Sequence, residues 1–234
     1  MNQFASGVLT YSYSVKPLRG GGEMALQRLA VAVLATAMVL MASAAAQEKN
    51  ELAGTIGRTF ISNQGVPGAN FANNEIHFGN GLSFEVTYGR RILGTEDSLA
   101  TLTFEVPFVY NPDEDLNFGS NAIPESYSSF FITPAARANL FASTGVSPWV
   151  SFGGGFGHFS ESSNLLFFGT NTGARGTTTG VYQLGVGLDV KLFGRFKLRG
   201  EARDFNSGVP QLNVDTGKSR QHNYFVGGGV VWHF

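Results

Sequence analysis

The segment His158-Phe159-Ser160 holds two residues with the chemistry of a hydrolase. Residues i and i+2 of an extended strand point to the same side, so this imidazole could serve as base for the serine nucleophile. Such a pair also needs an orienting carboxylate on a neighbouring strand. The outward residues expected there are not acidic: Ser128, Phe130, Gly180 and Tyr182. We therefore expect a non-catalytic histidine and no enzymatic activity.

Other patterns could in principle bind ions or phosphate. Asp113-Glu114-Asp115 is an acidic run that lacks the alternate spacing of a calcium-binding loop, so it predicts a solvated acidic loop. The glycine-rich stretch 153–157 resembles a phosphate cradle, but neither a Lys-Ser/Thr pair nor a helix follows it. His77, His222 and His233 are scattered along the chain. We expect no metal site and no cofactor.

The composition limits the class of protein. The chain has 234 residues, 31 glycines, no cysteine and only 14% charged residues. This length suits one all-β domain, and the absence of cysteine excludes disulfides and thiolate metal sites. A net charge of −1 gives no electrostatic reason to expect a nucleic-acid partner.

One concentrated apolar block lies near the start of the chain. Leu29–Met41 is uninterrupted, follows Arg28, and leads to the small residues Ala44–Ala46, which is the layout of a secretory signal peptide. A membrane-spanning helix is the alternative, but it needs about 20 apolar residues. Translation from Met24 would give a typical signal peptide, whereas translation from Met1 would place 23 further residues before it. We predict a gene-model extension at 1–23, a signal peptide at 24–46 and the mature domain at 47–234.

The mature sequence alternates with a period of two. Between Tyr182 and Leu192, every even-numbered residue is large and apolar, whereas the odd-numbered ones are Gln183, Gly185, Gly187, Asp189 and Lys191. This period is typical of a strand with two unlike faces. Eight segments share the pattern, with the first and fifth less regular: 51–62, 83–93, 99–110, 128–141, 146–159, 182–192, 196–205 and 222–234.

The connections alternate as well. Tight turns at 94–98, 142–147 and 194–195 alternate with long polar loops at 64–80, 111–125, 160–177 and 206–221. Bacterial outer-membrane barrels show this asymmetry, and a spanning sheet must close because an unpaired backbone group is costly in hydrocarbon. We predict an all-β fold, an eight-stranded antiparallel up-and-down transmembrane β-barrel. A soluble β-sandwich is the alternative.

The last strand carries a family resemblance. Together with the export signal and eight alternating strands, it resembles the small OmpA-type outer-membrane β-barrels, or porin family. Five alternate residues resemble the signal that the barrel-assembly machinery recognises: Tyr224, Val226, Val230, Trp232 and Phe234. The resemblance implies a location in the outer membrane of a Gram-negative cell envelope, with outer-membrane lipid and lipopolysaccharide as neighbours. We expect no periplasmic peptidoglycan-binding domain.

Charged residues on the inward faces define the interior. They are Glu85, Glu105, Arg137, Asp189, Lys191, Arg199, Glu201 and Arg203. Buried charges are costly unless paired, so we expect Asp189 to pair with Arg199, and Glu105 or Glu85 with Arg137. An eight-stranded barrel has little interior space beyond its side chains. A plugged lumen is therefore predicted, and a gated pore lined by the same charges is the alternative.

Leu165-Leu166-Phe167-Phe168 is an apolar patch within a loop. It predicts a lid over the barrel mouth or, second, a contact with a surface partner that the sequence does not name. The expected role is structural or interactive at the cell surface, and a narrow channel or carrier for a small solute is the alternative. His158 and Ser160 also resemble the pair of lipid A deacylase barrels. Glu161 stands where that family has asparagine, so this alternative is remote.

Overall fold

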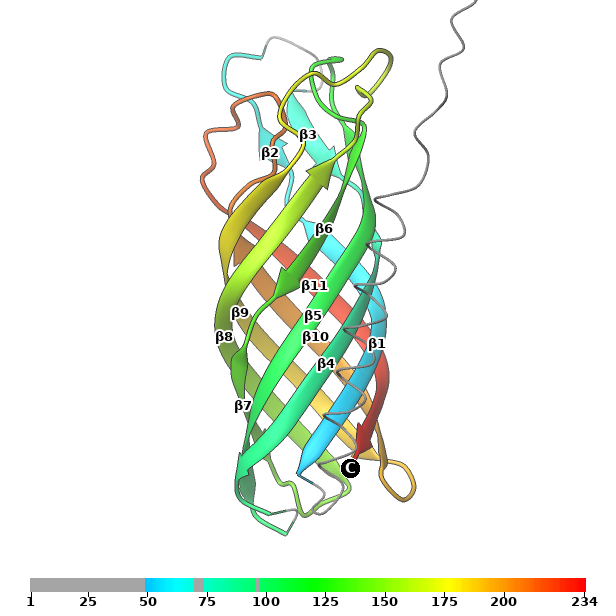
Figure 1. The fold of residues 1–234 in the computed structure, drawn as a ribbon, viewed down its shortest axis with the longest axis vertical. Coiled ribbons are helices and arrows are strands. Elements are labelled where there is room, and N and C mark those ends of the chain that lie inside the picture. The colour runs from blue at the N-terminus through cyan, green and yellow to red at the C-terminus, as the bar shows by residue number, and fades with distance from the viewer. Residues whose placement is uncertain (1–48, 70–73, 96) are drawn as a thin grey trace, which may run out of the picture. The chain divides into compact units, whose positions relative to one another are not determined.

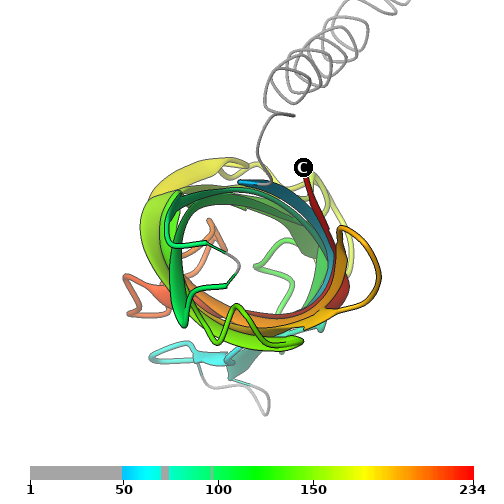
Figure 2. The same cartoon turned by 90° about the horizontal axis from the view of Figure 1, so that it is seen from below.

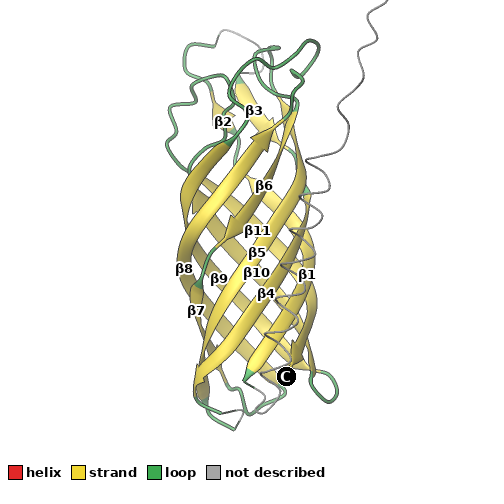
Figure 3. Cartoon of the chain, viewed as in Figure 1, coloured by secondary structure: helices red, strands yellow, loops and turns green. Residues whose placement is uncertain are grey.

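The computed structural model describes residues 49–69, 74–95 and 97–234, so the predicted extension at 1–23 and signal peptide at 24–46 lie outside the described residues. The described chain forms eleven strands (Figures 1 and 3): β1 Asn50–Ile61, β2 Gln64–Gly65, β3 Glu75–Phe78, β4 Leu82–Leu93, β5 Ala100–Asn117, β6 Ser126–Ile132, β7 Ala135–Leu140, β8 Val146–Glu161, β9 Thr177–Lys191, β10 Phe196–Ser207 and β11 Gln221–His233. None of the described segments is a helix long and apolar enough to cross a membrane.

The sheet closes on itself, as the view along the barrel shows (Figure 2). Strand β1 pairs antiparallel with β4 on one side and with β11 on the other. Strands β6 and β7 together form one wall element between β5 and β8, interrupted at Thr133 and Pro134 because proline has no N–H for the ladder. The predicted eight-stranded antiparallel barrel is thereby confirmed.

The two faces of the wall differ as the alternation predicts. Outward side chains at mid-strand are large, apolar and exposed; Val86, Phe152 and Leu184, for example, are 50%, 66% and 57% exposed. Inward positions toward the turn end hold mostly glycine, hydroxyl and charged side chains, whereas those toward the loop end hold buried apolar side chains such as Val109, Phe131 and Phe225. A continuous apolar belt of this kind would aggregate in water, so the outer surface is built to contact lipid.

The two ends of the barrel also differ (Figure 1). The short turns after β4, β7 and β9 lie at one end, here called the turn end, together with the C terminus. The long connections lie at the other end, here called the loop end. At the turn end, the backbones of Asn50 and Phe234 exchange two hydrogen bonds of 3.1 and 2.9 Å, which completes the seam between β1 and β11.

Strand β5 is longer than predicted. A bulge between Asn111 and Glu114 reverses the alternation, and the strand continues to Asn117. The predicted solvated loop at the acidic run is therefore wrong: Glu114 points inward and is buried, while Asp113 and Asp115 are exposed. Strand β3, inside another predicted loop, pairs with this outer part of β5. Because the outward residues here are acidic, this part lies beyond the lipid-facing belt.

Candidate functional site

The barrel interior contains a continuous chain of ion pairs. Its members are at most 6% exposed at the side chain and come from six strands: Glu51, Glu85, Glu105, Arg137, Asp189, Arg199, Glu201 and Arg203. Each lies at an inward position, so the period-two pattern of each strand sets the direction of the side chain. Charged groups from opposite walls can meet because the glycines between them add no side chains.

The chain begins near the turn end. Asp189 Oδ1 accepts from Arg199 Nε at 2.8 Å, and Arg199 Nη2 lies 3.1 Å from Glu51 Oε1. The same Glu51 oxygen lies 2.6 Å from Arg137 Nη2. Arg137 Nη1 then lies 3.1 Å from Glu105. Each guanidinium thus bridges two carboxylates, which compensates the cost of burying the charges.

The chain ends in a fork at Arg203. Its Nη1 donates to Glu105 Oε1 at 2.7 Å. Its Nε lies 3.0 Å from Glu201 Oε2 and 3.2 Å from Glu85 Oε1. One guanidinium therefore faces three carboxylates. Both predicted pairs, Asp189 with Arg199 and Glu105 with Arg137, occur within the chain.

Trp149 fills the space between the three arginines. Their guanidinium carbons lie 5.0–5.6 Å from the centre of its indole ring, a cation–π geometry. Its Nε1 donates to Asp189 at 3.2 Å. The side chain is 2% exposed. An aromatic ring thus occupies the middle of the polar interior.

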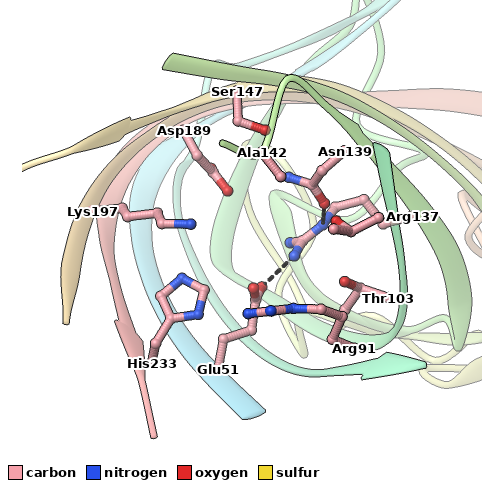
Figure 4. A pocket seen from close by; sticks show the side chains of 11 residues that line it. Glu51, Arg91, Thr103, Arg137, Asn139, Ala142, Ser147, Asp189, Lys197 and His233 are labelled. Carbon is pink, nitrogen blue, oxygen red and sulfur yellow. Dashed lines mark hydrogen bonds and ion pairs between the residues drawn. The ribbon is translucent and has the colours of Figure 1, made fainter. Parts of the chain in front are cut away.

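A small cavity opens below this chain at the turn end (Figure 4). Glu51, Arg137, Asp189, Lys197 and His233 point toward one another around it. Its volume of about 20 Å³ holds roughly one water molecule. The polar interior therefore meets solvent at the turn end through a space too small for a solute.

An apolar layer occupies the loop end of the interior. Its buried members are Ile61, Ile76, Val109, Leu116, Phe118, Ile123, Tyr127, Phe131, Phe159, Val181, Phe205, Leu212 and Phe225. The rings of Phe131 and Phe205 stack from different strands with centroids 5.1 Å apart. Phe159 packs edge-on against Phe131 at 5.9 Å. These rings separate the ion-pair chain from the loops.

Two residues of the polar interior were missed, and one was wrongly included. Glu51 was not predicted because Arg58 and two glycines, Gly54 and Gly57, blur the alternation of β1. Trp149 was overlooked because glycines blur β8 in the same way. Lys191 was expected in the interior, yet it is exposed at the last residue of β9, where solvent reaches the inward face.

Glu114 is a buried carboxylate in the outer part of β5, beyond the lipid-facing belt. Burial raises its pKa to about 7, although hydrogen bonds from Asn111 Nδ2 at 2.9 Å and Gly81 N at 3.3 Å act in the opposite direction. Tyr127 stands opposite it across the β5–β6 pair. Burial, together with the nearby charge of Glu114, raises the pKa of this phenol well above its usual value.

The hydrolase-like pair lies on the outside of the barrel. Ser160 Oγ lies 3.4 Å from His158 Nε2, and His158 Nδ1 lies 2.9 Å from Thr178 Oγ1. A hydroxyl therefore occupies the position that an orienting carboxylate takes in a catalytic triad. Within the described chain, there is no cluster of three or more histidine, cysteine, aspartate or glutamate residues suited to a metal ion.

The loop patch is divided in two. Leu166 packs against the apolar layer of the interior, whereas Phe167 and Phe168 are 62% and 76% exposed. Asn121 fixes this tip: its Oδ1 accepts from Phe167 N at 2.7 Å and Phe168 N at 3.2 Å, and its Nδ2 donates to Phe168 O at 2.7 Å. Only the first half of the patch covers the barrel mouth.

The final strand presents most of its predicted signal outward. Tyr224, Val226, Val230 and Trp232 are 39–50% exposed on the lipid-facing side. Phe234 differs from the expectation. It follows the end of β11, is 5% exposed, and stacks on Trp232 with ring centroids 4.7 Å apart.

Comparison with solved structures identifies the architecture. Neisserial surface protein A superimposes with a TM-score of 0.51 at 14% identity, over 79% of this chain and 97% of its own. The chain has the fold of a small outer-membrane β-barrel. This result confirms the predicted resemblance at the level of the fold and agrees with the predicted location in a bacterial outer membrane.

Two further barrels are similar at lower scores. The N-terminal β-barrel domain of Pseudomonas aeruginosa OprF has a TM-score of 0.44 at 11% identity, over 80% of this chain and 98% of that one. The outer-membrane enzyme PagL has 0.39 at 12% identity, over 76% and 97%. No protein-family model and no curated protein matches the sequence.

Proposed function

We propose that this outer-membrane barrel is a non-conducting, non-enzymatic protein that presents its loops at the cell surface. The observation that carries the proposal is the filled interior. The chain of ion pairs around Trp149 occupies the turn-end half, and the aromatic layer occupies the loop-end half. A solute would have to displace both layers in order to cross.

The turn end would face the periplasm and the loop end the outside of the cell, as is usual for bacterial barrels. The acidic outer part of β5 and the exposed tip of Phe167 and Phe168 then face the surroundings of the cell. Because Asn121 makes three hydrogen bonds to the backbone of this tip, a partner would bind the tip with less loss of conformational freedom than an unsupported loop. We propose contact with a surface partner as the role of this tip.

Two associations follow from the outer surface. The exposed apolar belt would be covered by outer-membrane lipid, with lipopolysaccharide around the outer rim. The outward residues Tyr224, Val226, Val230 and Trp232 would be recognised by the barrel-assembly machinery during insertion. Phe234 would act there before its ring is buried in the finished barrel.

Recording from planar bilayers tests the closed interior. Purified protein should give no discrete conductance steps. The double variant Trp149→Ala/Phe131→Ala removes one bulky ring from each layer. It should give discrete conductance steps where the wild type gives none. Uniform steps from the wild type, with an ion selectivity that changes in Glu105→Gln, would reject the proposal.

A narrow channel or carrier for a small solute is the second candidate. A feature in its favour is that polar side chains meet solvent at the turn end, although the cavity there holds only about one water molecule. Lipid A deacylation is a weaker candidate. Ser160 and His158 have the spacing, but Thr178 supplies a neutral hydroxyl in place of an acid.

A further inference from the structure

Asn80-Gly81 is the only place in the sequence where glycine follows asparagine. The pair lies at the loop end, immediately before the first residue of β4. In such a pair the backbone nitrogen of the glycine can attack the side-chain amide of the asparagine, because glycine has no side chain to obstruct the approach. The product is a succinimide ring, which water opens to aspartate or isoaspartate. The surroundings of this peptide group therefore decide how fast the pair reacts.

A charged or acidic side chain contacts each side of the peptide group. Arg58 Nη1 of β1 donates to the carbonyl oxygen of Asn80 at 2.8 Å. Gly81 N donates to Glu114 Oε2 of β5 at 3.3 Å. A cation at the carbonyl oxygen draws electron density from the peptide nitrogen, so the hydrogen on that nitrogen is easier to remove. A carboxylate within reach of the same hydrogen can accept it. Both contacts therefore favour attack by the nitrogen.

The fold restrains the nitrogen and leaves the asparagine side chain accessible. A Cβ at Gly81 would meet Asn111 Oδ1 at 2.5 Å and Glu114 Oε2 at 2.8 Å, so only glycine lets the peptide lie this close to β5. The carbonyl oxygen of Gly81 accepts from Thr59 N at 3.1 Å. The Asn80 side chain is exposed, and no hydrogen bond to another described residue holds it. It can therefore rotate toward the nitrogen.

We propose that Asn80 of the folded barrel converts spontaneously to aspartate or isoaspartate, with Glu114 as the base that removes the proton from Gly81 N. The nitrogen forms a bond to Asn80 Cγ, and the side-chain nitrogen takes up the proton from Glu114 and leaves as ammonia. Water then adds to one carbonyl carbon of the ring and breaks its C–N bond, which leaves a carboxyl group that ionises. A negative charge thus replaces a neutral amide beside Arg58. The reaction depends neither on a surface partner nor on a closed lumen.

Comparison of the folded and the unfolded protein tests the proposal. The purified protein is incubated at fixed pH in detergent micelles and, separately, in guanidinium chloride. Mass spectrometry of the peptide that contains Asn80 then measures the loss of the amide with time. The folded wild type should convert about a hundredfold faster than the unfolded chain, the lower end of what a positioned base contributes to a rate. Asn80→Gln should abolish the change in this peptide.

Glu114→Gln separates the base from the intrinsic reactivity of the pair. Its rate in the folded state should fall to that of the unfolded chain or below, whereas its rate in guanidinium chloride should equal that of the wild type. The matched control Glu125→Gln changes an exposed acid on the same side of the barrel and should keep the fast reaction. The shift between boiled and unboiled samples on SDS gels shows that each variant is folded.

The pH dependence identifies the base. The charged or titratable groups around the peptide are Arg58 of β1, Asp113, Glu114 and Asp115 of β5, and Tyr127 of β6. Burial raises the pKa of Glu114 to about 7, and a carboxyl group accepts a proton only when it is ionised. The folded wild type should therefore react faster as the pH rises and level off above about pH 7. The rate of folded Glu114→Gln should keep rising.

Arg58 is a positioning residue, since it acts through the carbonyl oxygen of Asn80. Arg58→Lys keeps the positive charge and should react faster than Arg58→Met, and both should show the same plateau in the pH profile as the wild type. A folded wild type that converts no faster than the unfolded chain would overturn the proposal. An unchanged folded rate in Glu114→Gln would overturn it as well.

Discussion

Arg137 Nη2 lies 2.6 Å from Glu51 Oε1, although two wall strands, β4 and β5, separate β7 from β1. The pair therefore spans the interior. Arg137→Leu would remove the shorter of the two arginine contacts of Glu51 and one of the two arginine contacts of Glu105. We expect a loss of about 3 kcal/mol in the free energy of unfolding, because stranding a buried charge is costly. Denaturant unfolding in detergent measures it, and exposed Arg90→Leu is the control. An unchanged midpoint would contradict the pairing.

Adjacent glycines of β11 should differ in their tolerance of a side chain. A Cβ at Gly229 would overlap the backbone oxygen of Gly54 and the Cα of Thr55. At Gly228 the nearest atom is 3.6 Å away. We expect Gly229→Ala to lose roughly 1–3 kcal/mol and Gly228→Ala to stay near the wild type. The shift between boiled and unboiled samples on SDS gels reports the folded fraction. Equal folded fractions for the two variants would contradict the close approach of Gly229 to β1.

The raised pKa of Glu114 predicts a pH dependence. This carboxyl binds its proton more tightly in the folded state, with a pKa of about 7 against 4.5 in the unfolded chain. Its contribution to stability is therefore complete below about pH 4.5 and declines as the pH rises to about 7. Glu114→Gln should flatten this decline, whereas exposed Glu125→Gln should not. Hydrogen exchange of the backbone amides of residues 111 and 113–117 between pH 5 and 8 measures it. Identical pH profiles for the wild type and Glu114→Gln would show that Glu114 is not the source of the pH dependence.

His158→Ala should leave lipid A unchanged. The imidazole bonds to Thr178 rather than to an acid, so it is a poor base for Ser160. Mass spectrometry of lipid A from expressing cells is the measurement, with Ser160→Ala as a second variant. An acyl chain missing in wild-type cells and restored in both variants would establish a deacylase.

Sequence alternation was sufficient to predict the interior where strands are regular. Glu105 lies in a strand without glycine, and Gly200, the one glycine of the strand that holds Arg203, lies at an outward position, so the direction of both side chains followed from position alone. Glu51 could not be predicted with the same ease, because Arg58 occupies an outward position that apolar residues usually hold. The charge of Arg58 is stabilised by a hydrogen bond of 2.8 Å from its Nη1 to the carbonyl oxygen of Asn80, 22 residues away in the sequence.

The loop end was less predictable. Alternation carries no information across a bulge, so Asp113-Glu114-Asp115 suggested a loop although it continues β5. The aromatic layer was also missed, since Phe131 lies beside outward Phe130 and no sequence period separates two adjacent aromatics. Which partner each charge finds depends on strand register around the barrel. Register is a tertiary property that one strand does not encode.

The seam between β1 and β11 joins residues 162 to 182 positions apart in the sequence, and eleven residue pairs hold it. A nascent chain lacking its final strand would keep two raw sheet margins, and no local hairpin could substitute for the missing one. The barrel can therefore close only after the C-terminal strand β11 has been synthesised. A chain truncated before β11 would therefore expose two unpaired strand edges and be prone to aggregation and proteolysis.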